Sequence, residues 1–406
     1  MNKNTFFTGQ PIYSQIINQI PKWIVTQTAK ELNSDRYYKK FDTYTHLISI
    51  LFAAFKNCTS LREIEFGMSA CHQKMAHLGI NYIPARSTLS EANANRNPEV
   101  FEQIYYKLFD RFRQFLPDSR IKNKDKKLYI IDSTTVTLFQ EIMGSVGRKP
   151  IDGKRKGGFK VHTLIKADED VPMFIKIGKA ANHDSTFLKY INLPPGSLLT
   201  FDKGYVDYTQ YQRLTQEKIW FVTRLRTNAV WTLLKEKAID PQHKEKGVIF
   251  DKVVEIGHHH NNSIQRVKTR IIEYKDPLTK RVFTFLTNNM HLTPLRVAQI
   301  YQKRWQIELL FKRIKQNYPL QYFLGDNENA IKIQTWCSLI ADLLTKVIKA
   351  GVKRNWSYSC MVSVIRQNLM EYVSLIEYLK NPEKILNRYR QRVYNAREPD
   401  LFTNLF

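Results

Sequence analysis

The chain has 406 residues, of which 43% are hydrophobic and 25% are charged, and its formal net charge is +26. This length and hydrophobic content exclude a disordered chain and are sufficient for two or three domains with a buried core. The excess of 63 basic over 37 acidic residues costs self-repulsion in the folded state and is typical of a protein with a polyanionic partner.

Three further features exclude other classes of protein. The longest apolar run, residues 47–55, is too short to span a membrane. The first fifteen residues lack the apolar segment of a signal peptide, so we expect a cytoplasmic protein. The cysteines have no metal-binding spacing, and we expect all four to be buried, reduced thiols: Cys58, Cys71, Cys337 and Cys360.

Residues 1–120 hold several segments with apolar residues at helical spacing, which predict an all-helical domain. In the stretch 81–97, Pro84 followed by Thr88 and Glu91 predicts a helix that begins with a capping box. That helix would present short polar and basic side chains: Ser90, Asn93, Asn95 and Arg96. Such a surface suits a helix in a DNA groove, and it suits an ordinary surface helix equally well.

A basic stretch, 120–127, leads into a region where strand and helix patterns alternate. The strand patterns are β-prone and apolar and cover residues 128–132, 157–167, 171–181, 196–205 and 219–226. Helices are predicted to begin at Asp184 and at Asp207. The order of these elements predicts an α/β sheet whose front half is antiparallel.

Residues 227–290 form a different, β-rich region of three alternating strands joined by polar turns. The histidines at 258–260 sit at one such turn, and a loop tip is the better interpretation because no acidic or cysteine ligands lie nearby. Thr293 and Pro294 then predict the start of a helix that continues to residue 315. Further helices are predicted within 330–380.

On a helical wheel, residues 301–315 place a single acidic residue in a basic stripe. Glu308 shares its face with Tyr301, Arg304, Lys312 and Lys315, and apolar side chains border this stripe on both sides. Ion pairs between residues four apart on a helix are one explanation. The other is that the stripe faces a buried acidic or metal partner.

Two aspartates supply such a partner. Asp132 and Asp202 each end an apolar strand of the predicted sheet, and strand ends of α/β sheets are where sites form. Each alone is explained as a helix cap or a turn residue. Together with Glu308 they could hold two divalent cations, which catalyse in-line phosphoryl displacement. Mg²⁺ suits such oxygen ligands, and Mn²⁺ can replace it.

The motifs resemble those of a known family. Tyr301, Arg304, Glu308 and Lys315 match Y-x2-R-x3-E-x6-K, the signature of bacterial insertion-sequence transposases of the DDE type in the IS-four family. The stretch IDSTTVTL around Asp132 resembles the first-aspartate motif of that family, and TFDKGYVDY around Asp202 resembles the second. The resemblance is strong over about 128–345 and looser in the region around residues 86–97.

The resemblance implies an RNase H-like catalytic core in which Asp132, Asp202 and Glu308 bind the metal ions. Glu308 follows Asp202 by 106 positions, which is similar to family members with a β-rich insertion domain. The predicted division is therefore a helical N-terminal domain that binds DNA ends (1–120), the first part of the core (121–226), the insertion domain (227–290), the second part of the core (291–325) and a helical C-terminal region (326–406).

The resemblance also implies residues that contact DNA. Tyr301, Arg304 and Lys315 match the positions that contact phosphates near the scissile bond, which agrees with the donors each side chain offers. Lys160 and His162 match positions near the active site, where structural roles are equally open. Arg86 and Arg96 are candidates in the N-terminal domain. Phe283 stands where relatives have a tryptophan that stabilises a flipped base, and Trp220 and Trp231 are alternatives.

The predicted function is that of a bacterial, nucleoid-associated cut-and-paste transposase. It would bind the terminal inverted repeats of an insertion sequence, cleave at its ends and join the 3′-OH ends to target DNA, with hairpin ends as an open alternative. Because two ends must be brought together, we expect a homodimer on double-stranded DNA. The alternatives are an RNase H-like nuclease or resolvase without strand transfer and a non-catalytic DNA-binding protein.

Overall fold

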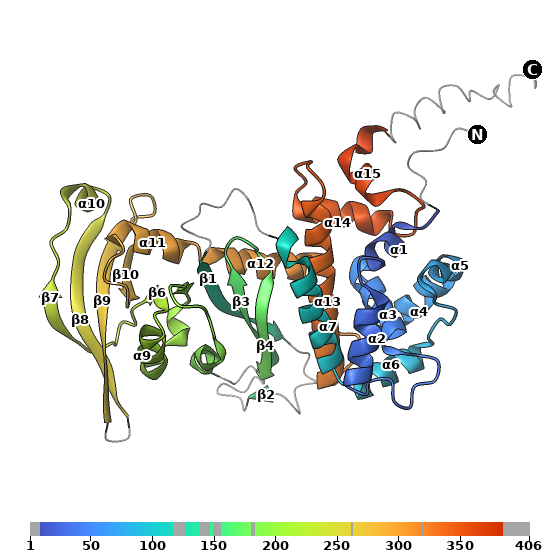
Figure 1. Ribbon diagram of the computed structural model, residues 1–406, viewed down its shortest axis with the longest axis horizontal. Coiled ribbons are helices and arrows are strands. Elements are labelled where there is room, and N and C mark those ends of the chain that lie inside the picture. The colour runs from blue at the N-terminus through green and yellow to red at the C-terminus, as the bar shows by residue number, and fades with distance from the viewer. Residues whose placement is uncertain are drawn as a thin grey trace, which may run out of the picture. The chain divides into compact units, whose positions relative to one another are not determined.

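The computed structural model describes residues 9–116, 127–137, 147–148, 156–179, 183–260, 263–318, 320 and 322–384 (Figure 1). The chain divides into two compact units, Met1–Phe115 with Arg313–Phe406 and Leu116–Lys312. The boundary between them falls inside helix α12 (Trp305–Asn317). The five-part division expected from the sequence is finer than this and stays a prediction.

The first unit is helical. Its elements are α1 (Ile12–Ile17), α2 (Lys22–Glu31), α3 (Thr43–Lys56), α4 (Leu61–Ala70), α5 (His72–Met75), η1 (Ala76–Leu78), α6 (Arg86–Asn95), α7 (Glu99–Phe112), η2 (Arg113–Phe115), α13 (Glu328–Ala350), α14 (Tyr358–Gln367) and α15 (Leu375–Lys380). Helix α3 is buried along its whole length up to Lys56 and packs against α13. Asp42 caps α3 by accepting a hydrogen bond from the Thr45 N–H at 2.7 Å.

Helix α6 begins earlier than the sequence suggested. Its first residue is Arg86, so Thr88 lies inside the helix and the predicted capping box is wrong. The residue before the helix, Ala85, has no side chain that could cap it. Instead, the Glu65 carboxylate on α4 accepts a hydrogen bond from the Arg86 N–H at 3.0 Å. The cap therefore comes from another helix, which local sequence patterns do not reveal.

The second unit contains one large sheet. Its strands are β1 (Leu128–Thr137), β2 (Gly147–Arg148), β3 (Lys156–Lys166), β4 (Pro172–Lys179), β5 (Leu198–Thr200), β6 (Trp220–Arg224), β7 (Trp231–Glu236), β8 (Val248–His260), β9 (Ser263–Lys275) and β10 (Val282–Thr287). In the described part of the chain, their order is β2-β3-β1-β5-β6-β10-β9-β8-β7, with β4 beside β3. Strands β1, β5 and β6 are parallel, and β3 is antiparallel to β1 and β4.

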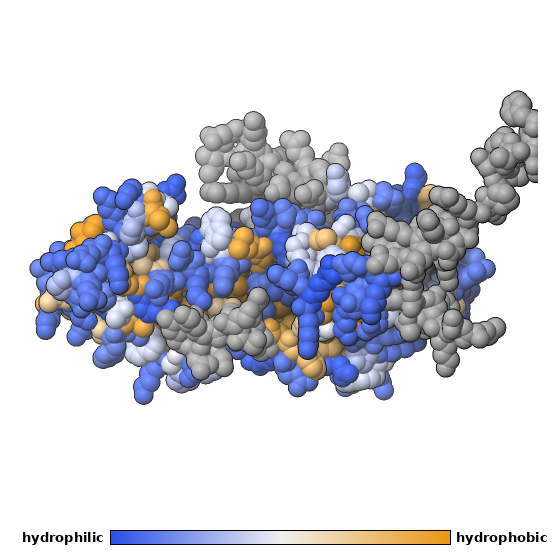
Figure 2. All heavy atoms as spheres, turned by 90° about the horizontal axis from the view of Figure 1, so that it is seen from above, coloured by the Kyte–Doolittle hydropathy of each residue, from blue (hydrophilic) through white to orange (hydrophobic). Residues whose placement is uncertain are grey.

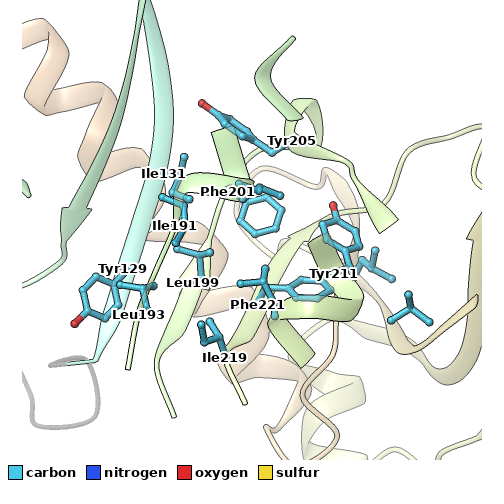
Figure 3. Close-up of a cluster of buried hydrophobic side chains, with 14 of the residues drawn as sticks. Tyr129, Ile131, Ile191, Leu193, Leu199, Phe201, Tyr205, Tyr211, Ile219 and Phe221 are labelled. Carbon is cyan, nitrogen blue, oxygen red and sulfur yellow. The ribbon is translucent and has the colours of Figure 1, made fainter. Parts of the chain in front are cut away.

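Short helices join and cover these strands: η5 (Asp184–Tyr190), η6 (Lys203–Tyr205), α9 (Tyr208–Gln216), α10 (Pro241–Glu245) and α11 (Pro294–Gln302). The helix predicted at Asp184 is a 3-10 helix. A core cluster fills the space between the sheet and α9, with Ile131, Leu199, Phe201, Tyr211 and Phe221 at its centre (Figure 3). This packing holds β1 and β5 side by side, which fixes the positions of the residues that follow them.

The single helix predicted over 294–315 is two helices, α11 and α12, with Lys303 and Arg304 between them. At this junction the N–H of Arg304 bonds to the carbonyl of Tyr301, and the N–H of Ile307 bonds to the carbonyl of Arg304. These tighter bonds between residues three apart replace the regular helical pattern. The wheel that placed 301–315 on one continuous helix is therefore only approximate.

The surface is largely hydrophilic on the face seen in Figure 2, with separate hydrophobic patches. Among the described residues, no helix is long and apolar enough to cross a membrane. All four cysteines are free, but only Cys58 and Cys337 are buried; Cys71 is partly exposed and Cys360 is exposed. The expectation of four buried thiols is thus wrong for two of them. The histidines at 258–260 end β8 at its hairpin with β9.

Candidate active site

Two aspartates lie on neighbouring strands in the interior of the sheet of the second unit. Asp202 follows β5, as expected, but the prediction that Asp132 ends its strand is wrong, because β1 continues past Asp132 to Thr137. The parallel pairing of β1 and β5 puts Ile130 opposite Thr200, and Asp132 and Asp202 each follow two residues later in the same direction. Each aspartate has one carboxylate oxygen held by a backbone N–H, from Ser133 to Asp132 Oδ1 at 2.8 Å and from Gly204 to Asp202 Oδ2 at 3.3 Å. The strand register therefore brings two carboxylates together.

The junction between α11 and α12 supplies the third carboxylate and a cation. Arg304 Nη1 donates to Asp132 Oδ2 at 2.8 Å, and Arg304 Nη2 donates to Glu308 Oε1 at 2.5 Å. The three side chains are largely buried. A charge-assisted pair on each arm of the guanidinium is a strong interaction in such surroundings. Arg304 thus bridges the two acidic side chains.

Tyr301 reaches the remaining aspartate from the last turn of α11. Its hydroxyl donates to Asp202 Oδ1 at 3.3 Å, and its ring lies 5.3 Å from that of Phe285 on β10. The structure therefore brings together five of the predicted residues: Asp132, Asp202, Tyr301, Arg304 and Glu308.

Negative charge is crowded at this site. Burial raises the pKa of Asp132 to about 6, with the nearby Glu308 and Asp202 carboxylates adding to the rise and the Ser133 N–H and Arg304 opposing it. Burial alone would lower the pKa of Arg304, but its bonds and charges from Glu308 and Asp132 raise that pKa overall. Arg304 is therefore a permanent cation that offsets only part of the carboxylate repulsion.

A fourth carboxylate, which the sequence analysis took only for a helix start, lies close by. Asp184 Oδ1 accepts a hydrogen bond from Ser133 Oγ at 3.0 Å. The same oxygen forms an ion pair with Lys160 Nζ at 3.0 Å. Strand β4 runs parallel to β1 because β3 is antiparallel to both, so an acidic residue after β4 lies at the same end of the sheet as the last residues of β1. That direction was the signal that would have found Asp184.

Lys160 and His162 project from β3 toward Asp184. His162 is buried, and its Nδ1 lies 3.3 Å from the Tyr205 hydroxyl. Burial lowers the pKa of His162 to about 4, although Asp184 opposes this shift, so the ring is neutral at pH 7. This environment favours the structural role that the sequence left open for His162. Lys160 is largely buried and paired with Asp184.

A pocket of about 700 Å³ opens beside Asp202, Tyr301 and Arg304. Aromatic rings and cations line it, including Phe283, Phe285, Trp305, Arg224 and Arg281. The rings of Phe283 and Phe285 are parallel at 6.0 Å, and the Arg224 guanidinium lies 5.4 Å from the Phe283 ring. The pocket has the size of a small-molecule site, with flat apolar surfaces and positive charge next to the carboxylates.

Other predicted residues lie elsewhere. Lys315 follows Glu308 by seven residues on α12 but belongs to the first unit, and burial lowers its pKa. Arg86 is exposed at the start of α6. Arg96 and Asn93 are 1% exposed and bond to the protein itself, so the prediction that they contact DNA from a helix surface is wrong. Both were assigned from residue type, which does not reveal burial.

The donor set fits a hard divalent cation. Carboxylate oxygens are the ligands that Mg²⁺ prefers, and a cation beside Asp132 would favour its charged form, which burial disfavours. As the side chains stand, no three histidine, cysteine or acidic residues of the described chain lie close enough to hold an ion. Arg304 lies between Asp132 and Glu308, so both carboxylates would have to leave the guanidinium to bind a cation together.

Family models match two parts of the chain. The transposase DDE domain matches residues 123–344, more than half of the chain. A domain of unknown function, DUF4372, matches residues 8–81. The first match covers Asp132, Asp202 and Glu308, and the second covers α1 to η1.

Two relatives by sequence agree with the first match. A protein of Sinorhizobium fredii named as transposase y4zB is 29% identical over 65% of this chain and 71% of its own. A protein of Synechocystis named as a transposase for insertion sequence element IS4SA is 26% identical over 72% of this chain and 80% of its own. A piggyBac transposase synaptic complex with hairpin DNA has a TM-score of 0.40 at 12% identity, covering 97% of this chain and 85% of that chain.

Proposed function

The chain belongs to the transposase DDE domain family, and from this premise we propose that it mobilises an insertion sequence by cutting and joining DNA. It binds the terminal inverted repeats, cleaves at the ends of the element and joins the freed 3′-OH groups to target DNA. The observation that carries this proposal is the convergence of Asp132, Asp202 and Glu308 around Arg304 and Tyr301.

The order of the strands supports an RNase H-like core. Strands β4, β3, β1, β5 and β6 are neighbours in that order, the first three antiparallel and the last three parallel. Strands β7 to β10 form an antiparallel extension between Asp202 and Glu308. This extension is the proposed insertion domain, and the helices of the first unit are the proposed end-binding and C-terminal regions.

Asp132, Asp202 and Glu308 are the proposed ligands of two Mg²⁺ ions, which Mn²⁺ can replace. When bound, the ions would make a water or a 3′-hydroxyl nucleophilic and stabilise the leaving oxygen. The chain itself supplies the geometry: the Ser133 and Gly204 N–H groups fix one oxygen of each aspartate. The other oxygen of each faces α11 and α12, where Tyr301 and Arg304 contact it.

Tyr301, Arg304 and Lys315 are the proposed phosphate contacts. A DNA phosphate near the carboxylates offers the Arg304 fork a single bidentate partner in place of its one bond to each of two carboxylates. Transfer of Arg304 from Asp132 and Glu308 to that phosphate would free both carboxylates for the cations. DNA binding and cation binding would therefore assist each other.

The pocket beside Asp202 supports a pathway through hairpin ends. An extruded base needs a flat apolar surface to stack on and cations for its phosphates, and the Phe283 ring with Arg224 and Arg281 offers both. Phenylalanine lacks the indole of the tryptophan in relatives but keeps the aromatic face. Trp305, which lines the same pocket and is 58% exposed, is a second stacking surface.

A homodimer on DNA follows from the chemistry, because both ends of one element must be cut and joined together. The test of the whole proposal is a strand-transfer assay with precleaved ends of the element, a supercoiled target and Mg²⁺. We expect joined products. Nicked target without joined ends would show a nuclease or resolvase instead, and bound but unchanged DNA would show a non-catalytic binding protein.

A further inference from the structure

A groove of about 750 Å³ lies in the first unit, away from the carboxylates in the sequence. Its walls are the segment 33–41 between α2 and α3 and the stretch 82–97, which contains α6. The segment contributes Arg36, Tyr37, Lys39 and Lys40, and the other wall contributes Tyr82 and Asn95. Cations and aromatic rings thus share one groove.

The buried residue Arg96 holds this segment in place. Its Nη2 donates to the carbonyl of Phe41 at 2.8 Å and pairs with Asp35 at 3.3 Å, and its guanidinium lies 4.3 Å from the ring centre of Tyr38. Asp35 also accepts two hydrogen bonds from Thr43, at 2.7 and 2.8 Å. The one acidic residue of the segment is therefore used internally, and its exposed cations are left on a fixed backbone.

Tyr37 is placed where neither burial nor backbone preference explains it. Its side chain is 88% exposed, and its φ of 77° lies in the left-handed region that disfavours residues with a Cβ. The Arg36 guanidinium lies 5.1 Å from its ring. An outlier of this kind on a surface is a reason to look for a function.

We propose that this groove binds a DNA strand, with phosphates on Arg36, Lys39 and Lys40 and an unstacked base on Tyr37. Basic residues that follow the backbone and an aromatic platform for a base are the recurrent means of binding single strands. Asn95 and Glu91, which line the groove, can hydrogen-bond base edges. The inference rests on the proposed function, which supplies DNA as the partner, and adds a second strand-binding site to it.

The alternative is that the segment is a solvated basic loop without a partner. That explanation fits the lysines but not the fixed backbone or the strained, exposed tyrosine. The net charge of +26 shows a need for a polyanion, but it does not distinguish a nucleic acid from an acidic protein. The aromatic platform favours the nucleic acid, since stacking requires planar bases.

The test is the affinity of the full chain for a short fluorescein-labelled single-stranded DNA, followed by fluorescence anisotropy. We expect Tyr37→Ala to weaken binding about tenfold and Tyr37→Phe and Tyr37→Trp to bind as the wild type does, because they keep the ring. Changing Arg36, Lys39 and Lys40 together to alanine should reduce the slope of log affinity against log salt by about two units, at about 0.7 for each phosphate.

Helix α4 offers a matched control, because Arg62 and Phe66 are an exposed cation and an exposed aromatic residue outside the groove. The double variant Arg62→Ala, Phe66→Ala should bind the strand as the wild type does. Tyr37→Gly separates binding from folding: glycine adopts a φ of 77° without strain, so this variant should melt at a higher temperature yet bind as weakly as Tyr37→Ala.

Unchanged affinity in Tyr37→Ala and Tyr37→Gly would overturn the inference. The inference would also be overturned if polyglutamate displaced the labelled DNA as effectively as unlabelled DNA does, since the groove would then bind anions in general. If the wild type binds no DNA of any kind, the proposed function itself fails. If the wild type binds and the variants bind equally well, only the groove assignment fails.

Discussion

Arg304 holds Asp132 through a hydrogen bond of 2.8 Å between Nη1 and Oδ2, while its other terminal nitrogen holds Glu308. The guanidinium thus lies between two carboxylates that a divalent cation would need. Burial is the main cause of the raised pKa of Asp132, and the neighbouring carboxylates add to the rise although Arg304 opposes it. Arg304 is therefore expected to compete with the cation until DNA draws it away.

Arg304→Ala should bind Mn²⁺ more tightly than the wild type in the absence of DNA, by about tenfold, the equivalent of about 1.4 kcal/mol. The reason is the loss of a competing positive charge. Free Mn²⁺ measured by electron paramagnetic resonance at pH 8, above the raised pKa of Asp132, gives the affinity. The double variant Arg304→Ala, Asp132→Ala is the control, and its affinity for Mn²⁺ should not exceed that of the wild type. Equal affinity in Arg304→Ala and the wild type would show that Arg304 does not compete.

Asp132→Ala, Asp202→Ala and Glu308→Ala should each abolish cleavage while leaving the binding of element ends largely intact. Each removes a carboxylate from the cluster, and catalysis requires the complete set. A gel assay on labelled ends measures binding and cleavage in the same sample. Full cleavage by any one variant would remove that residue from the proposed site.

Lys315→Ala should weaken DNA binding and make the slope of log affinity against log salt shallower by about 0.9, the loss of one phosphate contact on duplex DNA. Filter binding at several salt concentrations gives the slope. Arg62→Ala, a cation exposed on α4, is the matched control and should keep the wild-type slope. An unchanged slope in Lys315→Ala would mean that Lys315 contacts no phosphate.

Phe283→Ala should reduce the yield of hairpin ends about tenfold or more while first-strand nicking continues, because base stacking on an aromatic ring contributes about 1–3 kcal/mol. Phe283→Trp should restore the yield. Denaturing gels separate hairpin from nicked DNA, and Phe66→Ala on α4 is the control. If the wild type yields no hairpin DNA, the pathway through hairpin ends is excluded. If Phe283→Ala yields as much hairpin DNA as the wild type does, a different aromatic ring stacks on the base.

His46 should make the first unit less stable in acid. Burial lowers the pKa of His46 to about 3 from 6.5, so the unfolded chain binds the proton more readily than the folded chain. Stability is then full above pH 6.5 and falls as the pH decreases toward 3. At pH 5 the loss from His46 is about 2 kcal/mol of unfolding free energy.

Urea denaturation at pH 7 and pH 5 measures this loss. In His46→Gln the amide can still donate to Asn93 Oδ1, the partner of His46 Nε2 at 2.8 Å, but it does not titrate. The variant should therefore lose less stability between the two pH values than the wild type. The same loss in both proteins would assign the pH dependence to other groups.

Local sequence patterns identified most residues of the candidate site, but they did not identify the residues that surround and contact them. Asp132 and Asp202 were found because each follows an apolar run that is visible in the sequence, although β1 continues past Asp132 to Thr137. The motif at Tyr301, Arg304 and Glu308 was found although its helix is broken at Arg304. Asp184 was missed because its position near Ser133 depends on the direction in which β4 runs. That direction follows from the pairing of the strands, which the sequence does not give.

The sequence by itself determined the family, the helical first region, the α/β region and the polyanionic partner, because spacing, motif and net charge are properties of the chain alone. Only the tertiary structure decided that Arg96 and Asn93 are buried, that Glu65 caps α6 and that Arg304 lies between two carboxylates. The physical reason is that burial, capping and ion pairing depend on partners from other elements, which residue type and local period do not specify.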